Sequence, residues 1–255
     1  MKIVAVTQAR MGSSRLPGKI LREINNISLL EIHLERIKNS RFVDDIIVAT
    51  TTKERDSEII RLCEKLNVAT YRGSEEDVLD RFYQALVHLK PDYVVRLTSD
   101  CPLIDSILID KVVRFTKSNN LDYGSNTLRR VFPDGQDVEV FKFNALRTAW
   151  ESAELKSERE HVTPYIWKNS SSMGGELFLS DNYSEDYNFG EIRMTVDEEE
   201  DFEVIKRLVE ALGIDKTWLE YTKFLIENPS IKNINSKYRL NEGYEKSLKN
   251  DQKLK

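Results

Sequence analysis

A short loop near the start of the chain combines positive charge with small residues, directly after the apolar segment Ile3–Val6. The residues that could do chemistry there are Arg10, Gly12, Ser13, Ser14, Arg15 and Lys19. Glycine and serine let backbone N–H groups approach an anion, and arginine and lysine supply the opposing charge. This combination suits a polyphosphate, and a basic surface loop with turn residues is the plainer alternative.

Neither of the two common nucleotide-binding loops fits this stretch. A P-loop requires serine or threonine after its Gly-Lys pair, and here Ile20 follows Gly18 and Lys19. A dinucleotide fingerprint requires three spaced glycines, and only Gly12 lies close to the first apolar segment. The loop also lacks the Gly-x-Ser-x-Gly pattern of hydrolases, so its serines are expected to donate to phosphate.

Two aspartates each follow an apolar segment that is expected to form a strand. Asp100 comes after Tyr93–Leu97, and Asp197 comes after Glu191–Val196. In open α/β sheets, ligands bind beyond the carboxyl ends of the strands, and a hard cation such as Mg²⁺ prefers carboxylate oxygens. A turn or helix-cap role is the alternative for Asp100, and helix-start chemistry explains the acidic residues 199–201.

The elements that must position these groups are indicated by hydrophobic periodicity. Near-continuous apolar runs alternate with segments of helical spacing, which is typical of an α/β fold with a doubly wound, mostly parallel sheet. The expected strands of the first half are 3–6, 46–50, 68–71 and 93–97, and the expected helices are 57–66 and 78–89.

After residue 121 the pattern changes. Residues 137–141 alternate polar and apolar side chains, so the second half is expected to be mixed and partly antiparallel. Helices are expected over 200–212 and 218–226, and the polar end of the chain, 247–255, is expected to fray.

Composition restricts the function classes. The 255 residues carry a net charge of −5, which argues against a general nucleic-acid binder. Only two cysteines occur, too few for a disulfide framework, and they favour a reducing, cytoplasmic setting. The first residues lack a signal-peptide pattern, and no segment approaches the roughly 20 apolar residues that cross a bilayer, so no membrane association is expected.

The loop from Arg10 to Lys19 resembles the signature loop of the cytidylyltransferases that make CMP-activated acidic sugars. The resemblance is to the spore-coat polysaccharide synthesis F-type branch, which is related to the CMP-KDO and CMP-sialate synthetases. It extends over most of the chain, through phrases at 72–83, 96–102, 135–140, 160–164 and 195–197. It implies a GT-A or nucleotidyltransferase-like, Rossmann-like fold with one domain over 1–230, in which 1–125 binds the nucleotide and 126–230 the acceptor. A polar tail, 231–255, follows.

The resemblance also implies roles for individual residues. Nucleotide contacts are expected from Gln8, Ala9, Arg10, Gly12, Ser13, Ser14, Arg15, Lys19, Arg72, Gly73, Ser74, Thr98 and Asp100. Acceptor contacts are expected from Arg81, Gln136, Asp137, Glu139, His161 and Arg193. Plainer interpretations remain open here: Ser74 as a helix cap, Arg81 in ion pairs, Asp137 and Glu139 on a solvated strand face, and His161 as a structural histidine.

The reaction implied is transfer of CMP from CTP to a small acidic acceptor, with release of pyrophosphate. Arg10, Arg15, Lys19 and Asp100 are the expected catalytic residues, and Asp100 with Asp197 would hold Mg²⁺, with Mn²⁺ as an alternative. The acceptor is either a sugar acid or a phosphorylated or phosphonate compound, and the setting is surface polysaccharide biosynthesis. A homodimer is expected. The alternatives are a GT-A-like glycosyltransferase that uses a finished sugar nucleotide and a non-catalytic nucleotide-binding protein.

Overall fold

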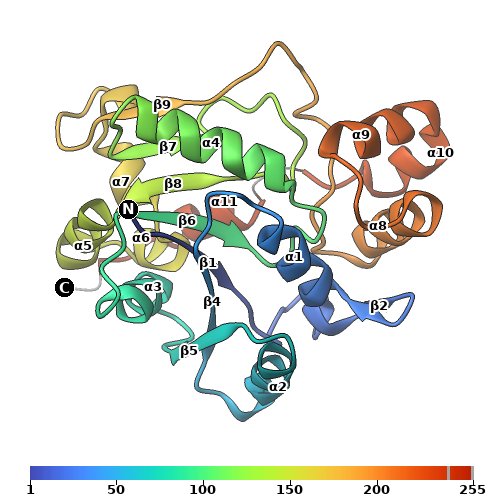
Figure 1. Cartoon of the computed structure of the whole chain (residues 1–255), viewed down its shortest axis with the longest axis horizontal. Helices are drawn as coiled ribbons and strands as arrows, with labels where there is room; N and C mark the ends of the chain where they lie inside the picture. The colour runs from blue at the N-terminus through green and yellow to red at the C-terminus, as the bar shows by residue number, and fades with distance from the viewer. Residues whose placement is uncertain (240–241, 254–255) are drawn as a thin grey trace.

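A seven-stranded sheet forms the centre of the protein, in the order β5-β4-β1-β6-β8-β7-β9 (Figure 1). The computed structural model describes residues 1–239 and 242–253. The strands of this sheet are β1 (Ile3–Gln8), β4 (Asp45–Thr51), β5 (Ala69–Gly73), β6 (Tyr93–Thr98), β7 (Tyr123–Ser125), β8 (Glu139–Lys142) and β9 (Ser180–Asn182). A separate small hairpin is formed by β2 (Glu23–Ile24) and β3 (Ile27–Ser28).

The first half of the sheet is parallel and the second half is mixed, as the sequence predicts. Strand β1 pairs in parallel with β4 and β6, and β4 pairs in parallel with β5. Strand β8 runs antiparallel to both β6 and β7, and β7 pairs in parallel with β9. The carboxyl ends of β1, β4, β5 and β6 therefore meet along one edge, where ligands bind in doubly wound folds.

Helices cover both faces of the sheet. The α-helices are α1 (Leu29–Lys38), α2 (Ser57–Lys65), α3 (Val78–Leu86), α4 (Ser106–Ser118), α5 (Phe143–Ser152), α6 (Lys156–His161), α7 (Pro164–Lys168), α8 (Glu199–Leu212), α9 (Trp218–Glu227), α10 (Pro229–Lys232) and α11 (Glu242–Lys249). Short 3-10 turns occupy η1 (Lys19–Leu21), η2 (Glu54–Asp56), η3 (Ser171–Met173) and η4 (Asn233–Asn235).

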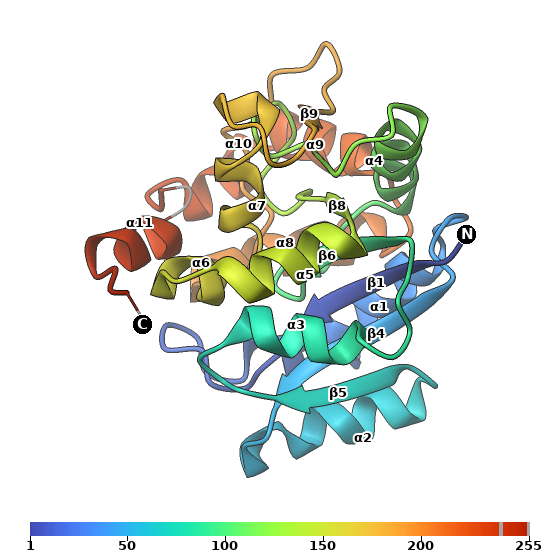
Figure 2. The same cartoon turned by 90° about the vertical axis from the view of Figure 1, so that its left-hand side faces the viewer.

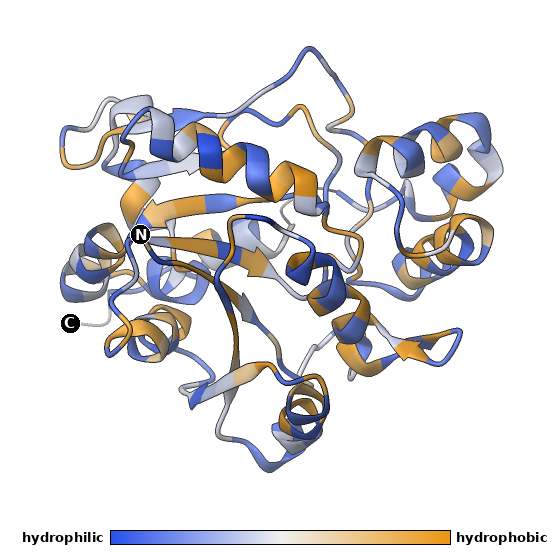
Figure 3. Ribbon diagram, in the orientation of Figure 1, coloured by the Kyte–Doolittle hydropathy of each residue, from blue (hydrophilic) through white to orange (hydrophobic). Residues whose placement is uncertain are grey.

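The side chains of β1 point alternately to the two faces of the sheet, and each face has its own apolar core. Val4 and Val6 pack in one apolar core with α3 and α5, whereas Ile3 and Ala5 face a second core with α4. Figure 2 shows α3 and α5 together on the near face of the sheet. Successive strand residues point to opposite faces, so the central strands β1 and β6 contribute to both cores and are mostly apolar. Figure 3 shows the central strands as mostly hydrophobic ribbon.

One expected strand is wrong. Residues 191–196 form no strand and make only a single parallel bridge, between Arg193 and Asp134. The backbone bonds of this segment go to two different loops: Met194 N–H donates to the carbonyl of Asp134 at 2.7 Å, and Val196 N–H donates to that of Asp100 at 2.8 Å. Its alternating apolar side chains pack against α8. The sequence therefore has the two-residue period of a half-buried strand, although no neighbouring strand forms hydrogen bonds with it.

Fraying was expected over 247–255, but residues 247–253 make specific contacts with the rest of the protein, and residues 254–255 lie outside the described part of the chain. Helix α11 packs against α6, and Asp251 accepts hydrogen bonds from the backbone N–H and the hydroxyl of Ser157, at 3.0 and 2.7 Å. The backbone N–H of Lys156 donates to the carbonyl of Gln252. Polar contacts, together with the packing of Tyr244 against the rings of His161 and Trp167, therefore hold this segment. None of the described helices is both long and apolar enough to cross a membrane.

Candidate active site

The loop after β1 folds back on itself and carries Lys19 to the carboxyl ends of the strands. Gly18 N–H donates to the carbonyl of Met11 at 3.0 Å, and Met11 N–H donates to the carboxylate of Asp56. Gly18 has φ +69°, a left-handed conformation that glycine adopts without a steric penalty, and it begins the short turn η1. The backbone conformation at Gly18 therefore directs the next residue inward, toward the strand ends.

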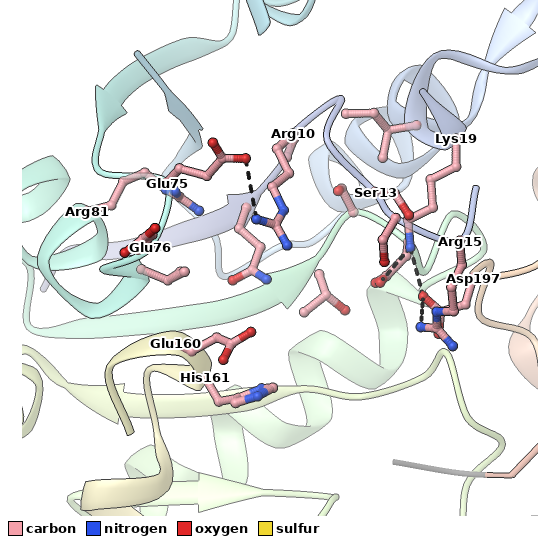
Figure 4. Close-up of a pocket in the computed structure, with 18 of the residues that line it drawn as sticks. Arg10, Ser13, Arg15, Lys19, Glu75, Glu76, Arg81, Glu160, His161 and Asp197 are labelled. Atoms are coloured by element: carbon pink, nitrogen blue, oxygen red, sulfur yellow. Dashed lines mark hydrogen bonds and ion pairs between the residues drawn. The ribbon is translucent and has the colours of Figure 1, made fainter. Parts of the chain in front are cut away.

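The ammonium group of Lys19 lies between the two aspartates that the sequence singled out (Figure 4). Its Nζ is 3.2 Å from Asp100 Oδ2 and 2.9 Å from Asp197 Oδ1, and it donates to the carbonyl of Val196 at 2.7 Å. Burial alone would lower the pKa of Lys19, but the two carboxylates outweigh it and raise the pKa. The lysine is therefore charged and bridges segments that lie far apart in the sequence.

Asp100 is ionised in this arrangement. Burial alone would raise its pKa, but the Lys19 ammonium group and the local hydrogen bonds lower the pKa of Asp100 to about 2. The adjoining residue Cys101 is fixed by His33, whose Nδ1 donates to the Cys101 carbonyl at 2.9 Å. Because that carbonyl can only accept, Nε2 of His33 accepts from the hydroxyl of Thr7 on β1 at 3.0 Å. Burial lowers the pKa of His33 to about 4, so this buried histidine is neutral.

Asp197 is held by two arginines as well as by Lys19. Arg15 from the basic loop contacts Asp197 Oδ1 at 2.9 Å and also contacts Glu198 at 3.2 Å. Arg193 donates to Asp197 Oδ2 at 3.1 Å and is anchored by Asp201 at 2.8 Å. Burial alone would lower the pKa of Arg193, but these carboxylates raise it. Arg193 is thus positioned to orient Asp197.

The basic loop and the strand ends line a cavity of about 390 Å³. Twelve residues predicted for the site border it: Gln8, Ala9, Arg10, Ser13, Ser14, Arg15, Lys19, Arg81, Thr98, Asp100, His161 and Asp197. The sequence did not single out four further charged residues that border it, Glu75, Glu76, Lys156 and Glu160. Glu75, Glu76 and Glu160 lie within phrases that carry the family resemblance, whereas nothing in the sequence alone distinguishes Lys156 from an ordinary surface charge.

Four residues expected to contact the nucleotide do not line this cavity. They are Gly12, Arg72, Gly73 and Ser74. The guanidinium group of Arg72 donates to the carbonyls of Thr51 and Thr52, and Ser74 Oγ accepts from the Asp77 N–H at 3.0 Å. In this conformation these two side chains support the strand end and the start of α3, which are structural tasks.

A second cavity, of about 400 Å³, adjoins the first and shares Thr98 and His161 with it. Asp137 and Glu139 line it, as expected for an acceptor pocket, but both are already paired with arginines. Arg130 binds Asp137 in a two-pronged contact at 2.8 and 3.0 Å. Glu139 is paired with Arg96, and Trp167 and Tyr244 add an aromatic part to the wall.

Two residues expected to contact the acceptor, Gln136 and Arg193, form hydrogen bonds within the fold instead. Gln136 is fully buried; its amide nitrogen donates to the carbonyl of Leu103, and its amide oxygen accepts from the Asp105 N–H. Arg193 is 8% exposed and lines neither cavity, and within the described chain its guanidinium group donates only to the carboxylates of Asp134, Asp197 and Asp201. In this conformation the polar atoms of both side chains are occupied by contacts within the fold.

The two aspartates that flank Lys19 have the oxygen ligands that a hard divalent cation prefers. The described residues contain no cluster of three or more histidine, cysteine or acidic side chains that could enclose a metal. Asp100 and Asp197 nevertheless direct oxygens at one point, where a positive group already sits. Mg²⁺ is commonly bound by one or two carboxylates together with substrate phosphates and water, so a pair of aspartates is sufficient.

Comparisons with protein families, with curated proteins and with solved structures each found similar proteins. A family model described as cytidylyltransferase matches residues 4–243. The chain is 43% identical to an uncharacterised protein of Methanocaldococcus jannaschii over 94% of this chain and 96% of that protein. It is 36% identical to the spore coat polysaccharide biosynthesis protein SpsF of Bacillus subtilis, over 83% of this chain and 88% of that protein. A solved cytidylyltransferase structure from Leptospira borgpetersenii has a TM-score of 0.85 and 33% identity, and the match covers 91% of this chain and 98% of that one.

Proposed function

Because this chain belongs to the cytidylyltransferase family and is a CTP-dependent nucleotidyltransferase, we propose that it transfers CMP to a small acidic acceptor. The acceptor is a sugar acid or a phosphorylated or phosphonate compound. An acceptor oxygen forms a bond to the α-phosphorus of CTP as the bond from that phosphorus to pyrophosphate breaks. The reaction needs charge neutralisation and in-line positioning rather than a protein nucleophile.

The observation that carries the proposal is the meeting of the basic loop with Asp100 and Asp197 at the strand ends. Arg10, Arg15 and Lys19 all border the same cavity and supply positive charge for the β- and γ-phosphates. Their present partners are carboxylates, at 3.6 Å for Arg10 with Glu75 and at 2.9 Å for Arg15 with Asp197. Binding a triphosphate would exchange these contacts for phosphate oxygens.

Mg²⁺ is part of the proposal, with Mn²⁺ as an alternative ion. Asp100 and Asp197 would hold it, because their oxygens converge and Arg193 and His33 fix the surrounding backbone and side chains. When bound, such an ion neutralises charge that develops on the phosphate oxygens. Lys19, which now occupies the space between the aspartates, would be directed toward the phosphates.

The acceptor would occupy the second cavity. Thr98 and His161 border both cavities, so the attacking oxygen and the α-phosphorus would meet beside them. Burial lowers the pKa of His161 to about 4, so the imidazole is neutral near pH 7 and contributes hydrogen bonding rather than charge. Nε2 of His161 is 3.0 Å from Ser247 Oγ on α11.

The proposal places this protein in the cytoplasm, in the biosynthesis of surface polysaccharide. The relative from Bacillus subtilis is named for spore coat polysaccharide biosynthesis, which supports a role in surface polysaccharide assembly. Both described cysteines are free and buried, which fits the cytoplasm. A homodimer is likewise proposed.

A pyrophosphate-release assay tests the function. The purified protein would be incubated with Mg²⁺, each of the four nucleoside triphosphates and a panel of sugar acids, phosphorylated acids and phosphonates. We expect release with CTP and one class of acceptor. Release that is equal for all four nucleotides, or that does not depend on any acceptor, would contradict the proposal.

A further inference from the structure

The nucleotide cavity has two chemically different ends. Lys19, Arg15 and Asp197 gather at one end, and Figure 4 shows Glu75, Glu76 and Arg81 at the opposite end, with Arg10 between them. The first end carries the cations expected for the phosphates. A nucleotide that extends its triphosphate toward Lys19 therefore directs its base toward the start of α3, where these residues lie.

Arg81 is buried, and its guanidinium group has a hydrogen-bond donor without a partner. It is 1% exposed, and its Nη1 donates to the carbonyl of Ser74. Its Nε has no hydrogen-bond partner, and Arg81 makes no ion pair with any residue in 1–239 or 242–253. Burial and the nearby charge of Arg10 lower its pKa to about 10, so it still carries its charge at neutral pH. A buried guanidinium group with unused donors is costly unless a ligand supplies acceptors.

Glu76 provides the complementary group. Its side chain borders the same cavity and is exposed, and it makes no ion pair or hydrogen bond to the described part of the chain. The adjacent Glu75 differs, because its carboxylate is 3.6 Å from Arg10 and also pairs with Arg55. Two arginines thus hold Glu75 through its Oε1, whereas neither carboxylate oxygen of Glu76 has a partner in the described part of the chain.

This pair of groups matches the hydrogen-bonding edge of one base. Cytosine presents an amino donor at N4 beside acceptors at N3 and O2. A carboxylate accepts from the N4 amino group, and an arginine fork donates to two adjacent acceptors. Uracil reverses the first two positions: its O4 would face a carboxylate, and its N3–H would face the arginine donors. Purines are larger and present other edges.

We propose that Glu76 and Arg81 read the cytosine base, with the Glu76 carboxylate accepting from N4 and the Arg81 guanidinium donating to N3 and O2. This inference rests on the proposed function, because it requires CTP as the nucleotide. It moves Arg81 from the acceptor pocket, where the sequence placed it, to the base end of the nucleotide cavity. It also makes Glu76 a residue that determines specificity for cytosine over uracil.

Glu76→Gln is the most direct test, because Glu76 is exposed and its replacement leaves no partner stranded. The affinities of the wild type and the variant for CTP and UTP, each with Mg²⁺, would be measured by calorimetric titration. We expect the ratio of CTP to UTP affinity to fall about ten- to a hundredfold, since an amide can rotate to donate to uracil O4. Glu64→Gln, an exposed glutamate on α2 that borders neither cavity, is the matched control and should leave the ratio unchanged.

Arg81→Lys supplies the second test, because it keeps the charge and loses the fork. Base contacts are common to CTP and CMP, so this variant should weaken binding of both by a similar factor, about tenfold or more. A loss confined to CTP would assign Arg81 to the phosphates and overturn the inference. Circular dichroism melting would establish that the variant is folded, and the Glu76→Gln result stands independently of it.

The outcomes separate this inference from the proposed function. Wild-type protein that binds CTP and UTP equally would remove the cytidylyl assignment itself. Wild-type protein that prefers CTP, together with a Glu76→Gln variant that keeps the same preference, would overturn only the base-reading role. Equal losses for CTP and UTP in Glu76→Gln would place the carboxylate on the ribose and would also overturn it.

Discussion

Replacing Lys19 with methionine should destabilise the free protein in a way that depends on pH. The change keeps a side chain of similar length and removes the charge that lies 3.2 Å from Asp100 and 2.9 Å from Asp197. Asp197 retains Arg15 and Arg193, but Lys19 is the one ion-pair partner of Asp100 within the described chain. The cost should therefore appear mainly at Asp100.

The magnitude follows from the pKa of Asp100, which is about 2 in the fold against an ordinary value of 3.8. This difference corresponds to about 2 kcal/mol of stability at neutral pH, or a fall in Tm of about 4 to 8 °C for a domain of this size. Because the pKa is lowered in the folded state, the contribution is present above the unfolded value and is lost as the pH falls toward 2. At pH 3 the difference between variant and wild type should be about half of its value at pH 7.

Thermal unfolding at pH 7 and pH 3 measures both quantities. Lys111→Met is the matched control, since it removes a lysine that pairs with Glu185 at 2.7 Å but is 42% exposed, and such surface pairs are worth at most about 1 kcal/mol. A Lys19→Met deficit of the same size at both pH values would show that packing, rather than charge, causes the loss. Added Mg²⁺ should stabilise Lys19→Met more than the wild type, because the two aspartates then lack their ammonium partner. Equal Mg²⁺ effects would refute the idea that lysine and metal share this position.

Four further outcomes are expected. Arg15→Ala should weaken CTP binding about ten- to a hundredfold and leave CMP binding nearly unchanged, as calorimetry can show, because CMP lacks the β- and γ-phosphates. Asp197→Asn should abolish Mg²⁺-dependent pyrophosphate release, and normal turnover would remove its metal role. Tm should fall while the protein still folds, because the carboxylate pairs with Arg15, Lys19 and Arg193. Glu139→Gln should lower Tm by several degrees, because its buried carboxylate accepts from the hydroxyls of Tyr123 and Thr163, at 2.6 Å each. Tyr244→Ala should raise the KM for the acceptor and not that for CTP in a steady-state assay, because the residue lines only the second cavity.

The first half of the fold could be predicted because its signals are local. Strands β1, β4 and β6 are apolar on both faces, and the intervening α2 has apolar residues on one side, so a short window of sequence specifies each element. The strand ends then carry the charged loop and Asp100 to one edge by topology alone. Lys19 and Asp100 are therefore expected in one site, and the structure places them in contact.

The second half was harder to predict because burial there is decided by partners far away in the sequence. Arg193 resembles an exposed cation ready for a ligand, yet Asp134 and Asp201 surround it and leave it 8% exposed. Gln136 likewise fills its hydrogen-bonding capacity with loop backbone at residues 103 and 105. Neither fact has a signal within a few residues of the side chain concerned.

The wall of the second cavity shows most clearly that contacts between distant residues cannot be predicted from the local sequence. The polar composition of the last residues predicts fraying, because few apolar groups are available to pay for order. What holds α11 is instead a set of polar contacts with α6: Asp251 with Ser157, and Ser247 with His161. Each contact needs a partner about 90 residues away, so it exists only once the sheet has brought α6 into place. The tail then adds Tyr244 to the proposed acceptor cavity and packs against His161, which borders both cavities. A segment that appears dispensable from its sequence is therefore part of the surface on which we expect the acceptor to be selected.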